Sequence, residues 1–139
     1  MELLHMKKSA AAEIAKRLIG EVGLGEKTYQ QFPVMMSGGE QQRVSIARAL
    51  ALQPQILFFG EPTSALDPEL TVEVLKVIKE LAKQHMTMII VTHEMQFAKE
   101  VSDKIIFMEG GHIKMQGTPE EIFASENERV KEFIGKLNA

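Results

Sequence analysis

The sequence predicts an α/β fold with a mainly parallel sheet, a C-terminal hairpin and flanking helices. Segments with helical periodicity alternate with short apolar runs, as in proteins whose parallel strands are joined by helices. The run Thr87–Thr92 is apolar and β-branched between polar ends, which is typical of a strand buried on both faces of a parallel sheet. Gly110 and Gly111 stand at the centre of a predicted hairpin turn.

The N-terminal part of the chain is predicted to be helical. Between Ser9 and Val22 the apolar residues recur at helical spacing, and Gly23 supplies a stop. Residues 23–34 contain Gly25 and Pro33 and show no periodicity, so they are predicted to form a loop.

A second helix is predicted to begin at Ser37. Ser37 and Glu40 have the spacing of a capping box, in which the hydroxyl accepts from the Glu40 amide and the carboxylate reaches back to the Ser37 amide. Gly38 and Gly39 in the first turn are poor helix formers that cost up to about 1 kcal/mol each against alanine. Something other than helix stability therefore favours these two glycines.

The inner faces of the second and third helices follow from their apolar spacing. In the second helix, Arg43 and Arg48 are predicted to face away from a buried stripe made of Val44, Ala47, Leu50 and Ala51. The third helix has Asp67 as its N-cap and Pro68 at its first position. Its predicted inner face comprises Leu70, Val74, Val77, Ile78 and Leu81.

Two further strands and two C-terminal helices complete the prediction. Ile56–Phe59 is a short apolar strand that ends at Gly60-Glu61, and Lys104–Met108 is the strand before the hairpin turn. Capping-box spacings begin at Thr118 and at Ser125, and each predicts a helix start.

Composition excludes several classes of function. The chain has 139 residues, a net charge of -3 and no cysteine. It therefore has no disulfide, no thiolate metal site and no basic field for nucleic acid. No apolar run approaches the length of a membrane span or of a signal-peptide core, so we expect contact with a membrane only through a partner.

Three short motifs occur in fixed order between Met36 and Pro68, and together they resemble those of the ATP-binding-cassette (ABC) ATPases. The motif that resembles the family signature is Ser37, Gly38, Gly39, Glu40 and Gln41. Ile56–Glu61 resembles the Walker B strand. The motif that resembles the D-loop is Ser64, Ala65, Leu66 and Asp67. The resemblance implies a partial P-loop NTPase core.

The resemblance also implies roles for single residues. Glu61 matches the catalytic glutamate, which orients a water for attack on a phosphoryl group. His93 matches the switch histidine that contacts the terminal phosphate, and the signature residues would bind the nucleotide of a second ATPase subunit. Without the resemblance, Glu61 is also consistent with a solvated loop residue. His93 is likewise consistent with a histidine that only hydrogen-bonds to the backbone. Asp67 is explained equally well as an N-cap.

Two departures from the family pattern bear on its cofactors, ATP and Mg²⁺. Gly60 stands where the family has an aspartate that helps to hold the metal, so the sequence predicts no metal site. Glu40 replaces a common glutamine and adds a negative charge near the expected phosphate.

The phosphate-binding loop of this architecture, G-x-x-x-x-G-K-S/T, does not occur in the 139 residues. The resemblance therefore covers nearly all of this chain but only the C-terminal half of the family's domain. We predict one domain over residues 1–139, with a helical signature region at 1–53, a sheet region at 54–117 and C-terminal helices at 118–139.

The family's sheet places its phosphate-loop strand between the strands that match Thr87–Thr92 and Lys104–Met108. Without that strand two edges would be open. We predict that the two strands pair directly, or that another copy fills the gap by swapping or strand addition.

Two functions remain open at this stage. The first, most similar to the polar-amino-acid importers, is an ATP-binding subunit that couples hydrolysis to uptake, on the cytoplasmic face of a membrane, with membrane subunits and a second ATPase subunit as partners. Hydrolysis by this chain unaided is not expected. The second is a non-catalytic remnant or interaction module that self-associates as a homo-oligomer or strand-swapped dimer.

Overall fold

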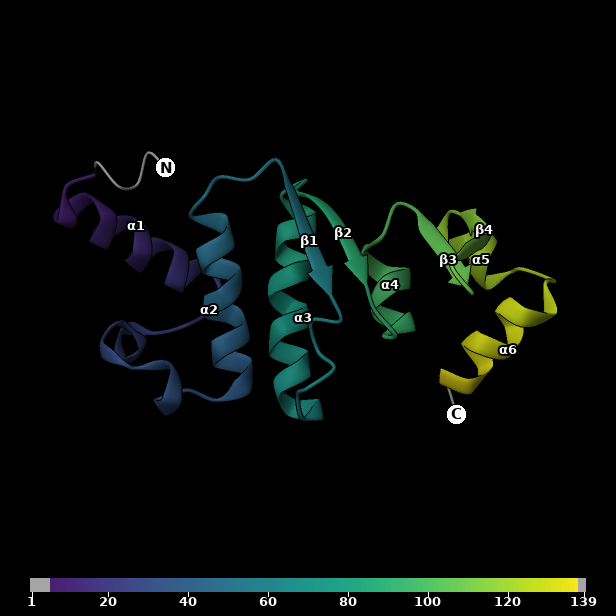
Figure 1. The fold of residues 1–139 in the computed structure, drawn as a ribbon, viewed down its shortest axis with the longest axis horizontal. Coiled ribbons are helices and arrows are strands. Elements are labelled where there is room, and N and C mark those ends of the chain that lie inside the picture. The colour runs from purple at the N-terminus through teal and green to yellow at the C-terminus, as the bar shows by residue number, and fades with distance from the viewer. Residues whose placement is uncertain (1–5, 138–139) are drawn as a thin grey trace. The chain divides into compact units, whose positions relative to one another are not determined.

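The computed structural model describes residues 6–137, and it divides into two compact units at the boundary between Ile90 and Val91. Figure 1 shows the helices and strands of both units. The α/β class is confirmed, with helices on one side of a parallel strand pair and with a C-terminal hairpin. The prediction of one domain stays a prediction.

The elements follow the predicted order. The first unit contains α1 (Lys8–Glu21), the 3₁₀ turns η2 (Glu26–Gln30) and η3 (Pro33–Met35), α2 (Gly38–Leu50), β1 (Ile56–Gly60), α3 (Pro68–Lys83) and β2 (Thr87–Val91). The second contains α4 (Met95–Val101), β3 (Ile105–Glu109), β4 (His112–Gly117), α5 (Pro119–Phe123) and α6 (Glu128–Leu137). The predicted loop over residues 23–34 thus includes a short 3₁₀ helix and enters a second.

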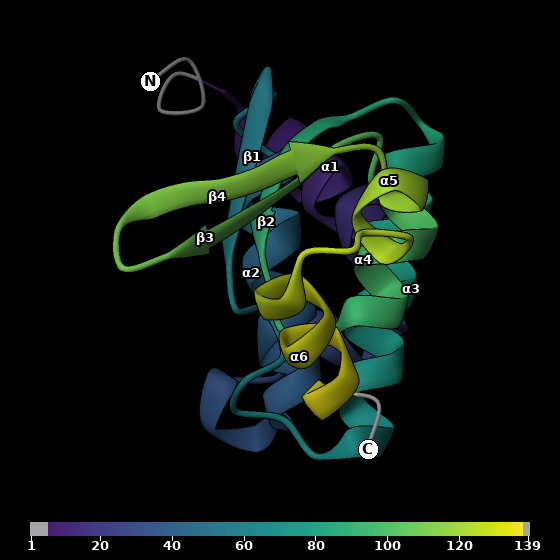
Figure 2. The same cartoon turned by 90° about the vertical axis from the view of Figure 1, so that its right-hand side faces the viewer.

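Strands β1 and β2 are neighbours in one sheet and run in the same direction (Figure 1). Leu57 and Phe59 of β1 are buried, and α3 lies on one side of the strand pair (Figure 2). The buried residues of α3 are Val74, Val77, Ile78 and Leu81, four of the five that were predicted. An amphipathic helix covering one face of parallel strands accounts for this core.

The prediction that Thr87–Thr92 is buried on both faces is wrong. Along β2, exposed and half-buried residues alternate, and Ile89 is 52% exposed. Phe58 on β1 is 73% exposed. The helices of the first unit cover only one side of the strand pair. The apolar residues that face the other side of β1 and β2 are therefore exposed.

Helix α2 contacts both α1 and α3, and this changes which of its residues are buried. Its buried residues are Gly39, Arg43, Ile46 and Ala47, whereas Val44 and Leu50 are only half-buried. The predicted stripe is therefore rotated, because a helix held between two others buries two sides. Arg43 was predicted to face away from the core, and that prediction is wrong.

The second unit contains the predicted hairpin. Strands β3 and β4 pair antiparallel, and Gly110 and Gly111 adopt positive φ angles of 58° and 77° in the turn. Helix α6 contributes Phe133, whose ring centroid lies 5.2 Å from that of Phe107 on β3. These contacts give the unit its own small apolar centre around buried Ile122 and Val130.

One of the two C-terminal capping boxes is confirmed. Thr118 and Glu121 form both reciprocal bonds at the start of α5. The box predicted from Ser125 is wrong, because α6 begins two residues later than that spacing requires. Instead the side-chain oxygen of Asn127 accepts from the amides of Arg129 and Val130, at 3.0 and 3.3 Å.

Strand β2 is the last strand of the first unit and β3 is the first strand of the second. Both alternatives for the open edges, direct pairing of these two strands and filling by another copy, stay predictions. Among the described residues, no helix is both long enough and apolar enough to cross a membrane.

Candidate functional site

The predicted signature turn is a well-formed helix start. The Ser37 amide donates to Glu40 Oε2 at 2.9 Å, and the Glu40 amide donates to Ser37 Oγ at 3.2 Å. The capping box is therefore confirmed. The hydrogen bond from the Ser37 amide lowers the pKa of the Glu40 carboxyl, and the Lys27 ammonium, 3.9 Å away, acts in the same direction. Glu40 thus holds its negative charge at the start of α2.

Replacing Glu40 by glutamine is expected to remove a pH-dependent part of the stability. A carboxyl with a lowered pKa in the folded chain stabilises it above the unfolded pKa, and this contribution is lost as the pH falls through the folded value. Because glutamine keeps the box without the charge, Glu40→Gln should cost at most about 1 kcal/mol at neutral pH. Urea unfolding at neutral pH and near pH 3 measures the difference. An equal loss of stability in both proteins on acidification would contradict the role of this carboxylate.

Gly38 and Gly39 lie where α2 meets the beginning of α3. A Cβ added at Gly38 would lie 3.0 Å from Leu66 Cδ2, and one added at Gly39 would lie 3.1 Å from Leu70 Cβ. The glycines therefore allow the first turn of α2 to approach the D-loop segment and α3 closely. This contact brings the starts of α2 and α3 to the same end of the first unit (Figure 1).

The fifth signature residue, Gln41, holds the preceding turn. Its side-chain nitrogen donates to the carbonyl oxygens of Pro33 and Met36, at 2.9 and 3.1 Å. These bonds fix the segment that leads into Ser37. We therefore assign Gln41 a positioning contact with the turn, while a contact with nucleotide stays a prediction.

Arg43 is the residue that the sequence analysis missed. Its side chain is 10% exposed and its Nη2 lies 2.6 Å from Glu73 Oε2 on α3. Its Nη1 also donates to the Gly23 carbonyl at 3.2 Å, just after α1. One guanidinium thus ties three helices together behind the signature turn. The apolar spacing of α2 gave no signal for it, since an arginine on a helix is usually exposed.

Glu61 occupies a strained position at the end of β1. Its φ angle is 49°, in the left-handed region that residues other than glycine rarely adopt, and Pro62 follows it. Its carbonyl accepts from the Ser64 amide at 3.2 Å and from Ser64 Oγ at 3.1 Å, which closes the turn. Strain of this kind is concentrated at functional sites. The residue at this position is a glutamate, although glycine would fit the backbone conformation better.

Glu61→Gly is expected to raise the free energy of unfolding by roughly 1 kcal/mol, because glycine adopts positive φ without strain. Glu61→Gln retains the strain and should change the free energy of unfolding by less than about 0.5 kcal/mol. His85, with a φ of 59° after α3, provides the matched control outside the candidate site. His85→Gly should stabilise by a similar amount in urea unfolding. If Glu61→Gly destabilised the chain while His85→Gly stabilised it, the strain at Glu61 would be disproved.

At the end of β1, Gly60 stands where the family has an aspartate, so the carboxylate is missing there. No atom lies within 4 Å of a Cβ built at Gly60, so an aspartate would have room there. Among the described residues, no group of three or more histidine, aspartate or glutamate side chains could hold a metal ion. Gly60 itself offers no side-chain oxygen to a metal, and the expectation of no metal site stays a prediction.

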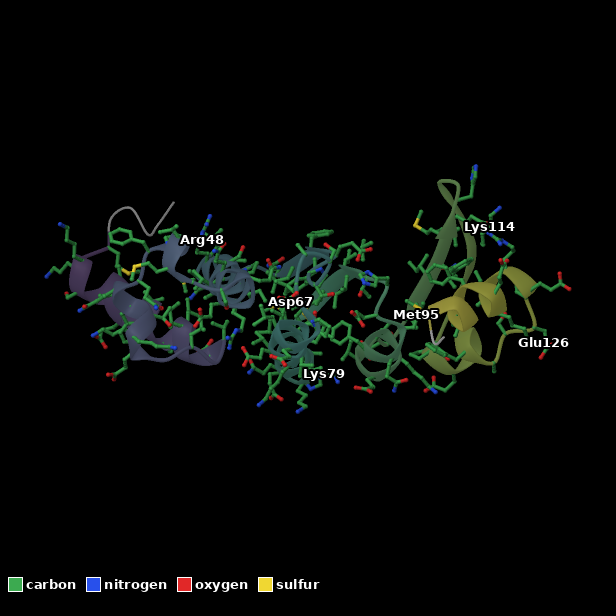
Figure 3. The ribbon with its side chains drawn as sticks, turned by 90° about the horizontal axis from the view of Figure 1, so that it is seen from below. Arg48, Asp67, Lys79, Met95, Lys114 and Glu126 are labelled. Carbon is green, nitrogen blue, oxygen red and sulfur yellow. The ribbon has the colours of Figure 1, made fainter. Side chains whose placement is uncertain are left out.

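The D-loop segment leads from β1 to α3. Ser64, Ala65 and Asp67 are exposed, and Leu66 is the half-buried residue beside Gly38. Asp67 is the N-cap residue of α3, as predicted, but its side chain makes no capping hydrogen bond. Figure 3, viewed from the end where α3 begins, shows Asp67 there. Capping alone therefore does not explain this aspartate.

His93 belongs to the second unit, two residues after the end of β2. Its side chain is 46% exposed, and Nε2 lies 3.9 Å from Glu94 Oε1, which would form an ion pair when the imidazole is protonated. The candidate site of the first unit therefore extends from Ser37 to Asp67. The switch role of His93 stays a prediction.

Comparison with known proteins identifies relatives of the whole chain. The profile of the family described as ABC transporter matches residues 2–64. The histidine transport ATP-binding protein HisP of Pseudomonas aeruginosa is 50% identical over 135 residues, which cover 96% of this chain and 53% of that protein. The L-cystine import ATP-binding protein TcyC of Bacillus subtilis is 53% identical over 138 residues, covering 99% of this chain and 56% of the relative.

A solved structure agrees with these relatives. The dimeric ATP-binding cassette MJ0796, bound to ADP and phosphate in a post-hydrolysis state, is 30% identical with a TM-score of 0.70. The similarity covers 82% of this chain and 49% of that one. The chain thus spans about half the length of the proteins that it matches.

Proposed function

Since this chain belongs to the ABC transporter ATP-binding family, we propose that it supplies the signature turn and D-loop to a nucleotide held by a second ATPase subunit. Its curated relatives are ATP-binding proteins of amino-acid transport. The proposal extends this role to the chain, with import of a polar amino acid as the coupled process. The proposed partners are that second subunit and the membrane subunits of a transporter, at the cytoplasmic face of the membrane.

The start of α2 is the observation that carries the proposal. The first amides of a helix have no intrahelical acceptor and form a natural anion site. Ser37 Oγ accepts from the Glu40 amide, which leaves its hydroxyl proton available for a donor bond. Leu66 and Leu70 hold Gly38 and Gly39 close to the start of α3. These groups fit the terminal phosphate of a nucleotide presented by the partner.

The remaining site residues have more limited roles. Glu61 would orient a water for attack on a phosphoryl group, with its backbone fixed by the Ser64 turn. His93 would contact the terminal phosphate, and Asp67 would reach across to the second subunit. Because Gly60 offers no side-chain ligand atom, no step is assigned to a metal bound by this chain.

Isothermal titration calorimetry with ATP, with and without Mg²⁺, tests the proposal. The chain alone should bind ATP weakly, because its sequence contains no phosphate-binding loop. Tight binding by the chain alone, with a dissociation constant near about 1 µM, would contradict a role completed by a partner. Ser37→Arg serves as a control, since it should leave any binding by the isolated chain unchanged.

The second candidate function is a self-associating module without catalysis. It is favoured by Gly60, which lacks a ligand atom, and by the exposed apolar residues of β1 and β2. The two candidates differ in one outcome. A module without catalysis would not stimulate nucleotide hydrolysis by an intact relative at any ratio, whereas a chain that completes a partner's site would.

A further inference from the structure

Arg43 is the one charged side chain that the described part of the chain buries. Its Nη1 donates to the Gly23 carbonyl and its Nη2 pairs with Glu73, but its Nε is buried without an acceptor among the described residues. An unpaired buried donor weakens a fold. Apolar side chains of similar volume can often replace a buried ion pair without loss of stability. Stability alone therefore does not explain why an arginine stands here.

The Gly23 anchor is fixed by the backbone at the end of α1. Gly23 has a φ of 74°. Its amide donates to the Gly20 carbonyl at 2.9 Å, and the Leu24 amide donates to the Ile19 carbonyl at 3.0 Å. These two bonds form a Schellman motif, which ends the helix in a well-defined turn. The Gly23 carbonyl thus lies at the C-terminal end of a helix, where a cation is favoured.

The Glu73 anchor lies on α3, one turn beyond Leu70. The contacts of the two signature glycines with Leu66 and Leu70 hold the starts of α2 and α3 close together. Contacts at one end of a helix pair leave the two helices free to pivot about that end. Arg43 and Glu73 meet one turn further along both helices, at 2.6 Å, and this additional contact opposes the pivoting.

We propose that Arg43 is a positioning residue: through Gly23 and Glu73 it holds the signature turn at a fixed place relative to the D-loop. The inference rests on the function proposed above, because both motifs would then meet the partner's nucleotide in one fixed arrangement. Arg43 acts through the backbone of α2 and does not itself touch the nucleotide. An arginine suits this task because its guanidinium holds two acceptors in a rigid fork, whereas a lysine there would hold only one of them.

Distances between spin labels test the positioning without any nucleotide. The chain has no cysteine, so Val34→Cys and Val72→Cys, made together, place one label on η3 and one on α3. The two valines are 90% and 67% exposed. The label at residue 34 reports on the signature turn, because Gln41 binds the Pro33 and Met36 carbonyls on either side of it. Electron paramagnetic resonance then gives the distribution of label distances.

The doubly labelled chain should give one narrow distance, and adding Arg43→Lys should shift or broaden the distribution. Ile78→Val is the matched control, since Ile78 is fully buried in α3 and its truncation lowers stability without removing either anchor. It should leave the distribution unchanged. Urea unfolding confirms that both variants are folded under the conditions of the measurement.

ATP hydrolysis in a mixture tests the consequence for the reaction. A full-length relative whose own signature serine is replaced by arginine holds the nucleotide, and this chain is added to saturation. Arg43→Lys should lower the maximal rate by about 10-fold, because a small misplacement of a positioning group slows the chemical step. The KM for ATP should stay within about twofold, since the relative still binds the nucleotide. Ile78→Val should retain the wild-type rate. Glu73→Gln, which keeps an oxygen acceptor for the guanidinium, should retain most of the rate that Glu73→Ala loses.

Unchanged label distances in Arg43→Lys would overturn the inference. So would an equal fall in rate for Ile78→Val and Arg43→Lys, since the arginine would then only stabilise the fold. A wild-type chain that does not stimulate the relative would instead contradict the proposed function, and the label distances alone would then decide whether Arg43 fixes the signature turn.

Discussion

Arg43→Ala is expected to lower the free energy of unfolding by roughly 3 kcal/mol, the largest effect of any single substitution considered. The change removes a 10%-exposed side chain, leaves the Gly23 carbonyl without its donor and deprives Glu73 of its partner. The buried stem of the arginine also contributes contacts that alanine cannot replace. Glu73 is half-exposed, so water compensates part of the lost ion pair. Urea unfolding followed by circular dichroism measures the change.

Arg48→Ala is the matched control for this substitution. Arg48 lies on the same helix but is exposed (Figure 3), so its removal should change the stability by less than about 0.5 kcal/mol. Equal losses for the two arginines would show that the contacts of Arg43 with Gly23 and Glu73 do not stabilise the fold. A double-mutant cycle with Glu73→Ala isolates the ion pair from the contacts of the stem.

Gly39→Ala should destabilise the chain by roughly 2 kcal/mol, although alanine is the better helix former. The added Cβ would lie 3.1 Å from Leu70 Cβ and 3.5 Å from the Leu70 carbonyl oxygen, and neither of these atoms can move without shifting α3. The gain of about 1 kcal/mol in helix propensity offsets only part of this overpacking. Thermal unfolding of the variant measures the net effect.

Two other glycines provide the comparison for Gly39. No atom lies within 4 Å of a Cβ built at Gly20 on α1, so Gly20→Ala should stabilise by up to about 1 kcal/mol. At Gly38 the nearest atom is the far end of the flexible Leu66 side chain, so Gly38→Ala should destabilise the chain less than Gly39→Ala does. Combining Gly38→Ala with Leu66→Ala should remove the steric overlap. If Gly39→Ala stabilised as Gly20→Ala does, the glycines would not be required by the contact between α2 and α3.

Features that depend on residues close together in the sequence could be predicted from the sequence alone. The capping box at Ser37 depends on residues three apart, and the hairpin turn depends on two adjacent glycines. The inner face of α3 followed from its apolar spacing, because that helix buries a single side. These features could be predicted before any tertiary contact was known.

Features that depend on distant neighbours could not be predicted in this way. Arg43 is buried because Gly23 and Glu73 supply partners from other helices, which no spacing within α2 reveals. The apolar run Thr87–Thr92 indicated a strand but not how many of its faces would be covered. The low helix propensity of Gly38 and Gly39 indicated only that something other than helix stability favours them, whereas the structure shows their close contact with Leu66 and Leu70.

Nucleotide hydrolysis in a mixture with a full-length relative tests the central claim most directly. The relative, such as the histidine transport ATP-binding protein of Pseudomonas aeruginosa, would carry arginine in place of its own signature serine, so that an intact signature turn could come only from this chain. Addition of the wild-type chain is predicted to restore ATP hydrolysis, and addition of the Ser37→Arg chain is not. Equal rates with the two chains, or hydrolysis by this chain in the absence of the relative, would contradict the account.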